Sequence, residues 1–170
     1  RPGAMHRNST QGFSLLELVV SLTLVAVLVG VFLDRVMFYR EQAEKSAMEQ
    51  VANDLRSSVN LRVAELALDN RFAELAALPG QNPMELLARK PQNYLGVLDS
   101  ARVQEVVTGN WYFDITSKEV VYYIDSGRYF VPDDQGRMRV AWRVKLEKGV
   151  GGAAAPQWAR LELVQPYRWF

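Results

Sequence analysis

The chain has 170 residues, with 20 lysines and arginines against 19 aspartates and glutamates, one histidine and no cysteine. This length suits one globular domain plus an anchor, and the near-neutral charge argues against bulk electrostatic binding to nucleic acid. Without cysteine, and with its single histidine at His6, the chain cannot build a disulfide scaffold, a cysteine-based zinc site or a histidine-dependent nucleophile. We expect neither an enzyme nor a cofactor, although carboxylate-only catalysis and an oxygen-ligated metal stay open.

Residues 1–12 form a polar, basic segment with Arg1 and Arg7 and no acidic residue. Basic residues ahead of a first membrane span keep that end in the cytoplasm, so the residues after Leu33 are expected to be exported. Because Arg1 is not an initiator, we expect that Met5 is the start, that more sequence precedes Arg1, or that residues 1–4 are not native.

Residues 13–33 form the most apolar stretch, in which Glu17 is the only charged residue of twenty-one. As a helix this stretch is about 31 Å long, close to the roughly 30 Å of a bilayer's hydrocarbon core. An ionisable residue inside a span costs up to about 3 kcal/mol, which makes Glu17 a candidate functional residue. The run is longer than a signal-peptide core and no small-residue cleavage site follows it, so we favour a retained anchor over a removed signal peptide.

The sequence Gly12-Phe13-Ser14-Leu15-Leu16-Glu17, behind a basic leader and ahead of the apolar run, resembles a prepilin cleavage site. Such sites mark the type IV filament superfamily, which comprises type IV pilins, minor pilins and the pseudopilins of type II secretion. The resemblance implies that a prepilin peptidase cuts between Gly12 and Phe13 and methylates the new amine of Phe13. It also implies that Glu17 promotes assembly by facing the N-terminal amine of an adjacent subunit.

Elementary electrostatics agrees with that implied role. An α-amine has a pKa near 7.7–8.0 and keeps its charge when methylated, so cleavage would create a cation that a carboxylate can pair with. A carboxylate in a first helical turn is also favoured by the helix dipole. The alternative is that Glu17 merely extends to the lipid headgroups. Ser21 and Thr23 are expected to hydrogen-bond to their own helix.

Beyond the span, an amphipathic helix is predicted over residues 34–78, where no proline or glycine occurs. We expect its apolar row to pack on its own domain, with the first part open to other helices of a filament. Charged residues fall off this row and are expected to face solvent, with Glu41 and Lys45 forming an i,i+4 pair. The row consists of Tyr39, Ala43, Ala47, Val51, Leu55, Val59 and Val63, and Val36 and Leu66 extend it.

Residues 79–170 are predicted to form a globular head. Pro79-Gly80 ends the long helix, and Asn82-Pro83 starts a short new one, with Asn82 as its cap. The apolar period then changes from 3.6 to 2, and turns are expected at 125–127 and 132–136. Strands are predicted at 111–114 and 119–124, which form a hairpin, and at 137–146 and 158–164.

These elements predict an α+β fold in which a long N-terminal helix, membrane-embedded first and amphipathic afterwards, packs on a small antiparallel sheet. This order resembles the pilin fold. The segments YLGV, NWYFD and VVYYI also resemble minor-pilin-like proteins of the mannose-sensitive haemagglutinin pilus system. Two features depart from that family: Asp34 stands where many major pilins have proline, which makes local unwinding of the helix during assembly less expected, and the cysteine pair of many pilins is missing, which favours a pseudopilin or an atypical minor subunit.

Two further groups of residues are candidate binding sites in the head. A basic strand face could bind DNA or an anionic polysaccharide, although a solvated face offset by acidic residues on adjacent strands is the favoured interpretation. Asp133 and Asp134, together with Asp125, could ligate Ca²⁺, although two aspartates before a glycine favour a turn. The basic face consists of Arg137, Arg139, Arg143 and Lys145.

The sequence therefore predicts a structural subunit of a type IV pilus or a type II secretion pseudopilus. Its expected partners are prepilin peptidase, other pilins or pseudopilins, the inner-membrane assembly platform, and membrane lipid before assembly. The leader is expected in the cytoplasm and the head in the periplasm. The rival hypothesis is a membrane-tethered receptor for DNA or surface polysaccharide that does not polymerise.

Overall fold

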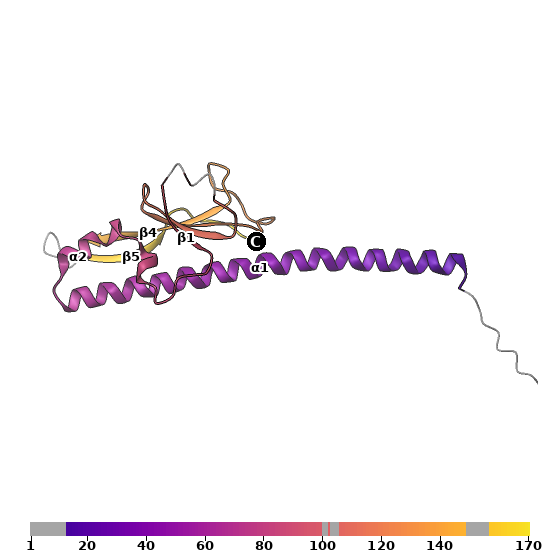
Figure 1. The fold of residues 1–170 in the computed structure, drawn as a ribbon, viewed down its shortest axis with the longest axis horizontal. Coiled ribbons are helices and arrows are strands. Elements are labelled where there is room, and N and C mark those ends of the chain that lie inside the picture. The colour runs from indigo at the N-terminus through magenta and orange to yellow at the C-terminus, as the bar shows by residue number, and fades with distance from the viewer. Residues whose placement is uncertain (1–12, 100–101, 103–105, 149–156) are drawn as a thin grey trace, which may run out of the picture. The chain divides into compact units, whose positions relative to one another are not determined.

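The computed structural model describes residues 13–99, 102, 106–148 and 157–170 (Figure 1). The chain divides into two compact units, Arg1–Tyr39 and Arg40–Phe170. Helix α1, Leu15–Leu68, begins in the first unit and ends in the second. The second unit adds helix α2, Phe72–Ala77, the 3₁₀ turns η1, Leu78–Gly80, and η2, Pro83–Leu86, and five strands. The strands are β1, Tyr94–Leu98; β2, Asn110–Asp114; β3, Glu119–Tyr123; β4, Arg139–Lys148; and β5, Gln157–Leu163.

In the first unit, the apolar side chains of α1 are exposed except that of Phe38, which is half-buried. By length and composition α1 can span a membrane, and none of its most apolar window is buried. The Thr23 hydroxyl donates to the Val19 carbonyl oxygen at 2.8 Å, which confirms the predicted bond to its own helix. Exposed apolar side chains along a helix require lipid or another apolar helix around them.

Helix α1 ends at Leu68, so the single helix predicted over residues 34–78 is wrong beyond that point. Asn70 adopts a left-handed backbone with φ of 57°. Its N–H donates to Ala67 O at 3.2 Å, and the Arg71 N–H donates to Leu66 O at 2.8 Å. These two bonds form a Schellman motif, in which asparagine is the commonest substitute for glycine. The shorter helix α2 follows after this reversal.

The five strands form one sheet in the order β1-β2-β3-β4-β5, antiparallel throughout except for the parallel pair β1 and β2. The predicted hairpin is confirmed, with Asp114 opposite Glu119 in β2 and β3. Strands β4 and β5 lie within two residues of their predicted bounds. The predicted α+β fold is thus confirmed.

Strand β1 was not predicted, and its irregular backbone explains why. Gly96 has a φ of 93°, and the register with β2 shifts between Tyr94 and Val97. Because of this bulge, Tyr94 packs against the main core while Leu98 packs against the smaller cluster of Tyr112, Val121 and Ala141. The sequence of β1, YLGVL, contains no polar residue, so no apolar–polar alternation marks it as a strand.

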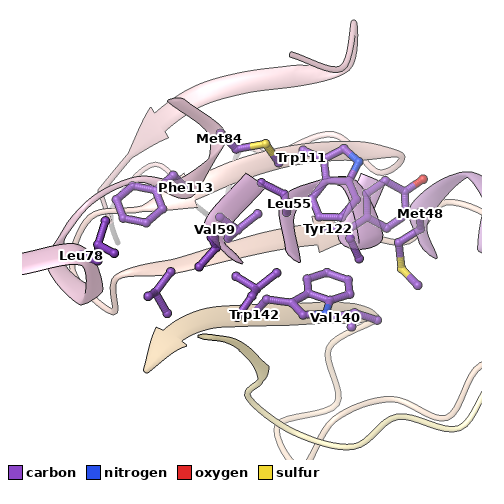
Figure 2. Packing of buried hydrophobic residues seen from close by; sticks show 14 of the residues in the cluster. Met48, Leu55, Val59, Leu78, Met84, Trp111, Phe113, Tyr122, Val140 and Trp142 are labelled. Carbon is purple, nitrogen blue, oxygen red and sulfur yellow. The ribbon is translucent and has the colours of Figure 1, made fainter. Parts of the chain in front are cut away.

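The main core lies between α1 and one face of the sheet (Figure 2). The expected row is only half correct: Leu55, Val59 and Val63 are buried, whereas Tyr39 and Ala43 are exposed. Each step of four residues overshoots a helical turn by about 40°, so a strict four-residue row winds off the buried face. The buried face of α1 consists of Glu41, Met48, Ala52, Leu55, Val59, Val63 and Leu66.

The predicted start of the short helix after residue 81 is confirmed as a 3₁₀ turn. The Asn82 side chain accepts a hydrogen bond from the Met84 N–H at 3.1 Å, and Pro83 occupies the first turn. The Asn82 amide also donates to the Tyr94 hydroxyl at 2.7 Å. This cap therefore connects η2 to the first residue of β1.

Candidate assembly site

The first turn of α1 presents Phe13, Ser14 and Glu17 at the start of the exposed apolar helix. The Glu17 N–H donates to Ser14 Oγ at 3.2 Å, and the Leu18 N–H donates to the Ser14 carbonyl oxygen at 3.1 Å. Ser14 is thus the N-cap, and Glu17 is the third residue of the helix, the spacing of a capping box. Phe13 lies just before the cap and is exposed, while Gly12 lies outside the described residues.

This arrangement fixes Glu17 in the first turn of α1, close in the chain to Phe13. Helix α1 begins two residues after Phe13, so the proposed new amine and the Glu17 carboxylate belong to the same helix terminus. The positive end of the helix dipole favours the carboxylate there. A carboxylate fixed at an exposed helix start can meet a cation from another chain, which is the role that the sequence predicts and which stays a prediction.

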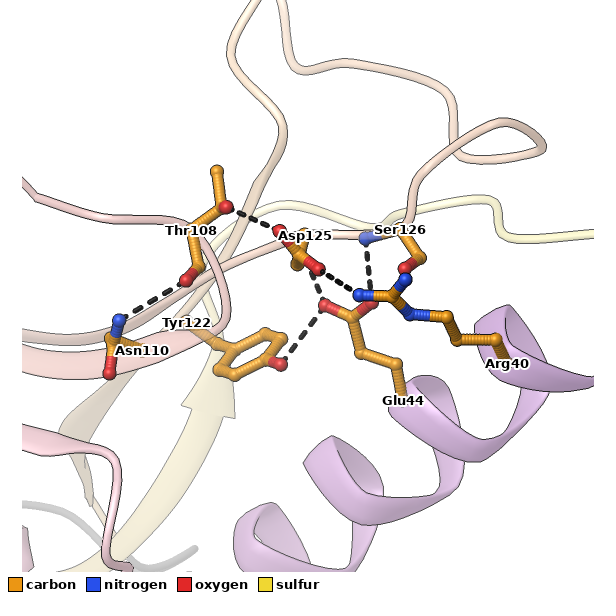
Figure 3. A network of polar contacts seen from close by, with 7 residues as sticks. All are labelled: Arg40, Glu44, Thr108, Asn110, Tyr122, Asp125 and Ser126. Carbon is orange, nitrogen blue, oxygen red and sulfur yellow. Dashed lines mark hydrogen bonds and ion pairs between the residues drawn. The ribbon is translucent and has the colours of Figure 1, made fainter. Parts of the chain in front are cut away.

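In the second unit, the Glu44 side chain of α1 reaches the end of β3 (Figure 3). One of its oxygens accepts from the Tyr122 hydroxyl at 3.0 Å and from the Asp125 N–H at 2.7 Å, and the other accepts from the Ser126 N–H at 2.7 Å. The Asp125 carboxylate pairs in turn with Arg40 at 3.0 Å. Burial, and then the nearby Glu44 carboxylate, raise the pKa of the Tyr122 hydroxyl, which keeps it a proton donor.

Glu41 corrects the expectation that the charged residues of α1 face solvent, because it is only 2% exposed. Its Oε1 accepts from the Tyr129 N–H and from the Trp169 indole N–H, both at 2.8 Å. The predicted pair of Glu41 with Lys45 is wrong, since Lys45 pairs with Glu49 at 3.9 Å and donates to the Trp169 carbonyl at 3.2 Å.

Glu49 makes a third contact of this kind, accepting from the Tyr167 hydroxyl at 3.1 Å. Burial, followed by the Glu49 carboxylate, raises the pKa of Tyr167 to about 12. Three glutamates of α1 therefore bind three segments that are distant in sequence. The sequence carried no local signal for these contacts, because the partners of Glu41, Glu44 and Glu49 lie 78 to 128 residues away.

The four cations of the predicted basic face each have a carboxylate partner. Arg143 pairs with Glu119 of β3, and Lys145 pairs with Glu162 of β5 at 3.0 Å. Arg137 and Arg139 both pair with Asp133, at 3.1 and 3.2 Å. Carboxylates of β3, of β5 and of the turn at Asp133 thus offset much of the charge of this face, which leaves little net positive charge to attract a polyanion.

Asp133 lies in the predicted turn over residues 132–136. Its Oδ1 accepts from the Gln135 and Arg137 N–H groups at 3.0 and 2.8 Å, while Oδ2 faces the two arginines. Partial burial alone would raise the pKa of Asp133, but the hydrogen bonds from Arg137, Arg139 and Gln135 outweigh it and lower the pKa. Both oxygens are thus already occupied, and the described residues include no cluster of three metal-ligating side chains.

Comparison with known proteins identifies the N-terminal segment. Residues 7–33 match the family model of the prokaryotic N-terminal methylation motif. No curated protein and no solved structure matches the chain. The motif supports the type IV pilin-like superfamily, whose members are prepilin-peptidase substrates that assemble with other pilins, and it indicates a structural rather than a catalytic protein. Together with the apolar helix, it fits a membrane-anchored protein.

Proposed function

We propose that this protein is a minor pilin or pseudopilin, a building block of a type IV pilus or a type II secretion pseudopilus. The observation that supports the proposal most strongly is the start of α1. The matched methylation motif contains a capped first turn with Glu17, followed at once by an exposed apolar helix. The missing cysteine pair favours these two classes over a major pilin.

In this proposal, cleavage after Gly12 changes the charge at Phe13. Before cleavage the nitrogen of Phe13 is a neutral amide, and afterwards it is an amine that is cationic at neutral pH. The Glu17 carboxylate of a neighbouring subunit can then pair with it. Such a pair lowers the cost of an acidic residue in an apolar helix, because each charge is neutralised when helices pack together.

The proposed topology is a single span in the inner membrane, with the leader in the cytoplasm and the head in the periplasm. Basic residues 1 and 7 on the leader side support this orientation. The proposed partners are prepilin peptidase, the other subunits of the filament and the inner-membrane assembly platform. The apolar face of α1 would exchange lipid for neighbouring helices as the subunit enters the filament.

Two substitutions test this proposal in the native host. Gly12→Asp should block cleavage, so that mass spectrometry finds the leader still attached. Glu17→Val should allow cleavage and methylation of Phe13 but reduce the amount of subunit in sheared filaments or crosslinked pseudopili. Glu17→Asp, which keeps the charge, is the matched control and should assemble better than Glu17→Val. Incorporation of both Gly12→Asp and Glu17→Val at wild-type levels would overturn the proposal.

A further inference from the structure

Strand β5 lies at one edge of the sheet, because its only neighbour among the described strands is β4. The Val164 N–H donates to Ala141 O at 2.9 Å, so these two residues form a hydrogen-bonded pair. Successive residues of an antiparallel strand direct their N–H and C=O groups alternately to either side. Leu161 and Leu163 therefore direct theirs away from β4, toward the free edge. These groups make no hydrogen bond within the described part of the chain.

A groove of about 330 Å³ lies beside the end of β5, between α1 and the sheet. Its floor is apolar, because Ala52 and Trp142 are buried and Leu163 is half-buried. Leu163 thus belongs both to the free edge and to the lining of the groove. The polar side chains of the lining are Glu49, Asn53, Arg56 and Tyr167.

Arg56 gives this groove a positive charge that is open to a partner. Its guanidinium donates to Asn53 Oδ1 at 2.7 Å, and it forms no ion pair with a carboxylate of the described residues. The Glu49 carboxylate in the same groove is already engaged, because it accepts from the Tyr167 hydroxyl at 3.1 Å and faces Lys45 at 3.9 Å. The remaining guanidinium donors of Arg56 can therefore bind an incoming carboxylate.

We propose that this free edge binds an extended segment of a partner protein as an additional strand, with an acidic side chain of that segment paired with Arg56. An unpaired strand edge is a template for such pairing, in which backbone hydrogen bonds supply affinity and pockets select alternate side chains. A partner residue that bonds to Leu163 has its side chain on the same face as Leu163, toward the groove. Apolar and acidic residues at alternate positions fit the apolar floor and Arg56. Under the proposed function this segment belongs to a neighbouring subunit, although the binding itself requires no filament.

The test uses the full chain in detergent micelles and a fluorescein-labelled peptide, Val-Thr-Leu-Thr-Glu-Thr-Val, as the probe. The leucine and the glutamate of the peptide are two residues apart, so in an extended strand they face the same side. Fluorescence anisotropy should show saturable binding. Replacing the glutamate of the peptide by glutamine should weaken the binding about tenfold, because the charged pair with Arg56 is lost.

Two N-methylated peptides of equal mass test the backbone pairing. Methyl groups on the leucine and glutamate nitrogens remove the N–H groups that would bond to the edge, so binding should weaken at least about tenfold. Methyl groups on the two threonines that flank the glutamate leave those N–H groups in place, because neighbouring residues direct their N–H groups to opposite sides. This second peptide should bind like the unmethylated one.

The charge requirement is tested with Arg56→Gln, which should weaken binding of the glutamate peptide about tenfold and leave binding of the glutamine peptide unchanged. Arg89→Gln is the matched control and should bind like wild type. Arg89 is likewise exposed and forms no ion pair among the described residues, but it does not line the groove. Near-ultraviolet circular dichroism checks that each variant is folded; if Arg56→Gln is not, the glutamate and glutamine peptides on the wild-type chain decide the test.

Three results would overturn the inference. They are the absence of saturable binding of the glutamate peptide up to about 1 mM, equal binding of the two methylated peptides, and equal binding of the glutamate peptide to Arg56→Gln and Arg89→Gln. Because the assay needs no filament, any of these results leaves the proposed function standing. Peptide binding by a chain that never enters filaments would instead remove the proposed function and keep this inference.

Discussion

At the scale of single residues, Asp133 shows how one carboxylate can stabilise a loop. It binds two backbone N–H groups and two arginines, and its pKa is lowered in the folded state. We expect Asp133→Asn to lower the free energy of unfolding by about 1–3 kcal/mol at neutral pH, because hydrogen bonds to a charged group contribute about that much. Urea denaturation of the purified variant measures the loss.

The pH dependence of this loss has a definite sign. A carboxylate with a lowered folded-state pKa stabilises above its unfolded pKa of about 3.9, and that stabilisation disappears as the pH falls through the folded value. Wild type and Asp133→Asn should therefore converge in acid. Asp134→Asn, at the exposed neighbouring position, is the control and should change stability by less than about 0.5 kcal/mol. A difference for Asp133→Asn that persists unchanged at low pH would contradict this account.

The contacts of a single residue could be predicted only where its partner lies nearby in the sequence. Ser14 and Glu17 lie three residues apart, so the capped turn is visible in the sequence. Glu41 and Glu44 were expected to face solvent, because their partners lie 78 to 128 residues away. Nothing in the local pattern of charges identifies a carboxylate that a distant loop will cover.

At the scale of elements, the end of α1 depends on Asn70. Its left-handed backbone places the two N–H groups that close the helix. We expect Asn70→Gly to keep or slightly raise stability, because glycine adopts this conformation freely. Asn70→Val should lower the free energy of unfolding by about 1–2 kcal/mol, the cost of a left-handed backbone for a residue with a branched Cβ. Thermal unfolding of the two variants side by side measures the difference; equal stability would show that the turn does not require this backbone.

Elements with regular side-chain periods were predicted well, and irregular ones were not. The long strand β4 alternates apolar and polar residues over most of its length, and β2 and β3 are short runs of aromatic and β-branched residues on either side of a short connection. The helix end at Leu68 has no proline or glycine to mark it, and β1 (YLGVL), with its bulge at Gly96, has no polar residue to alternate with its apolar ones. In both places the local structure depends on one residue with a positive φ, Asn70 or Gly96. The spacing of apolar residues along the sequence gives no sign of such a residue.

At the scale of the whole molecule, the chain has two kinds of apolar surface, one exposed and one buried. The span exposes its apolar side chains, whereas the second unit buries its own between α1 and the sheet. The first kind is visible as an unbroken run in the sequence, and the matched motif lies on it. The hydrogen bonds that attach the head to α1 join residues far apart in the sequence. The packing of the head on α1 was therefore predicted, but the contribution of Glu41, Glu44 and Glu49 to it was not.

The second unit should consequently fold without the first. Its core and the hydrogen bonds of Glu41, Glu44 and Glu49 all lie within residues 40–170. A chain starting at Arg40 should be soluble, unfold in one cooperative transition and keep the near-ultraviolet signal of its buried tryptophans. The full chain in detergent is the control and should unfold at a similar temperature. Helical far-ultraviolet signal without near-ultraviolet signal would mean a molten globule, and would show that the head requires the residues before Arg40 to pack.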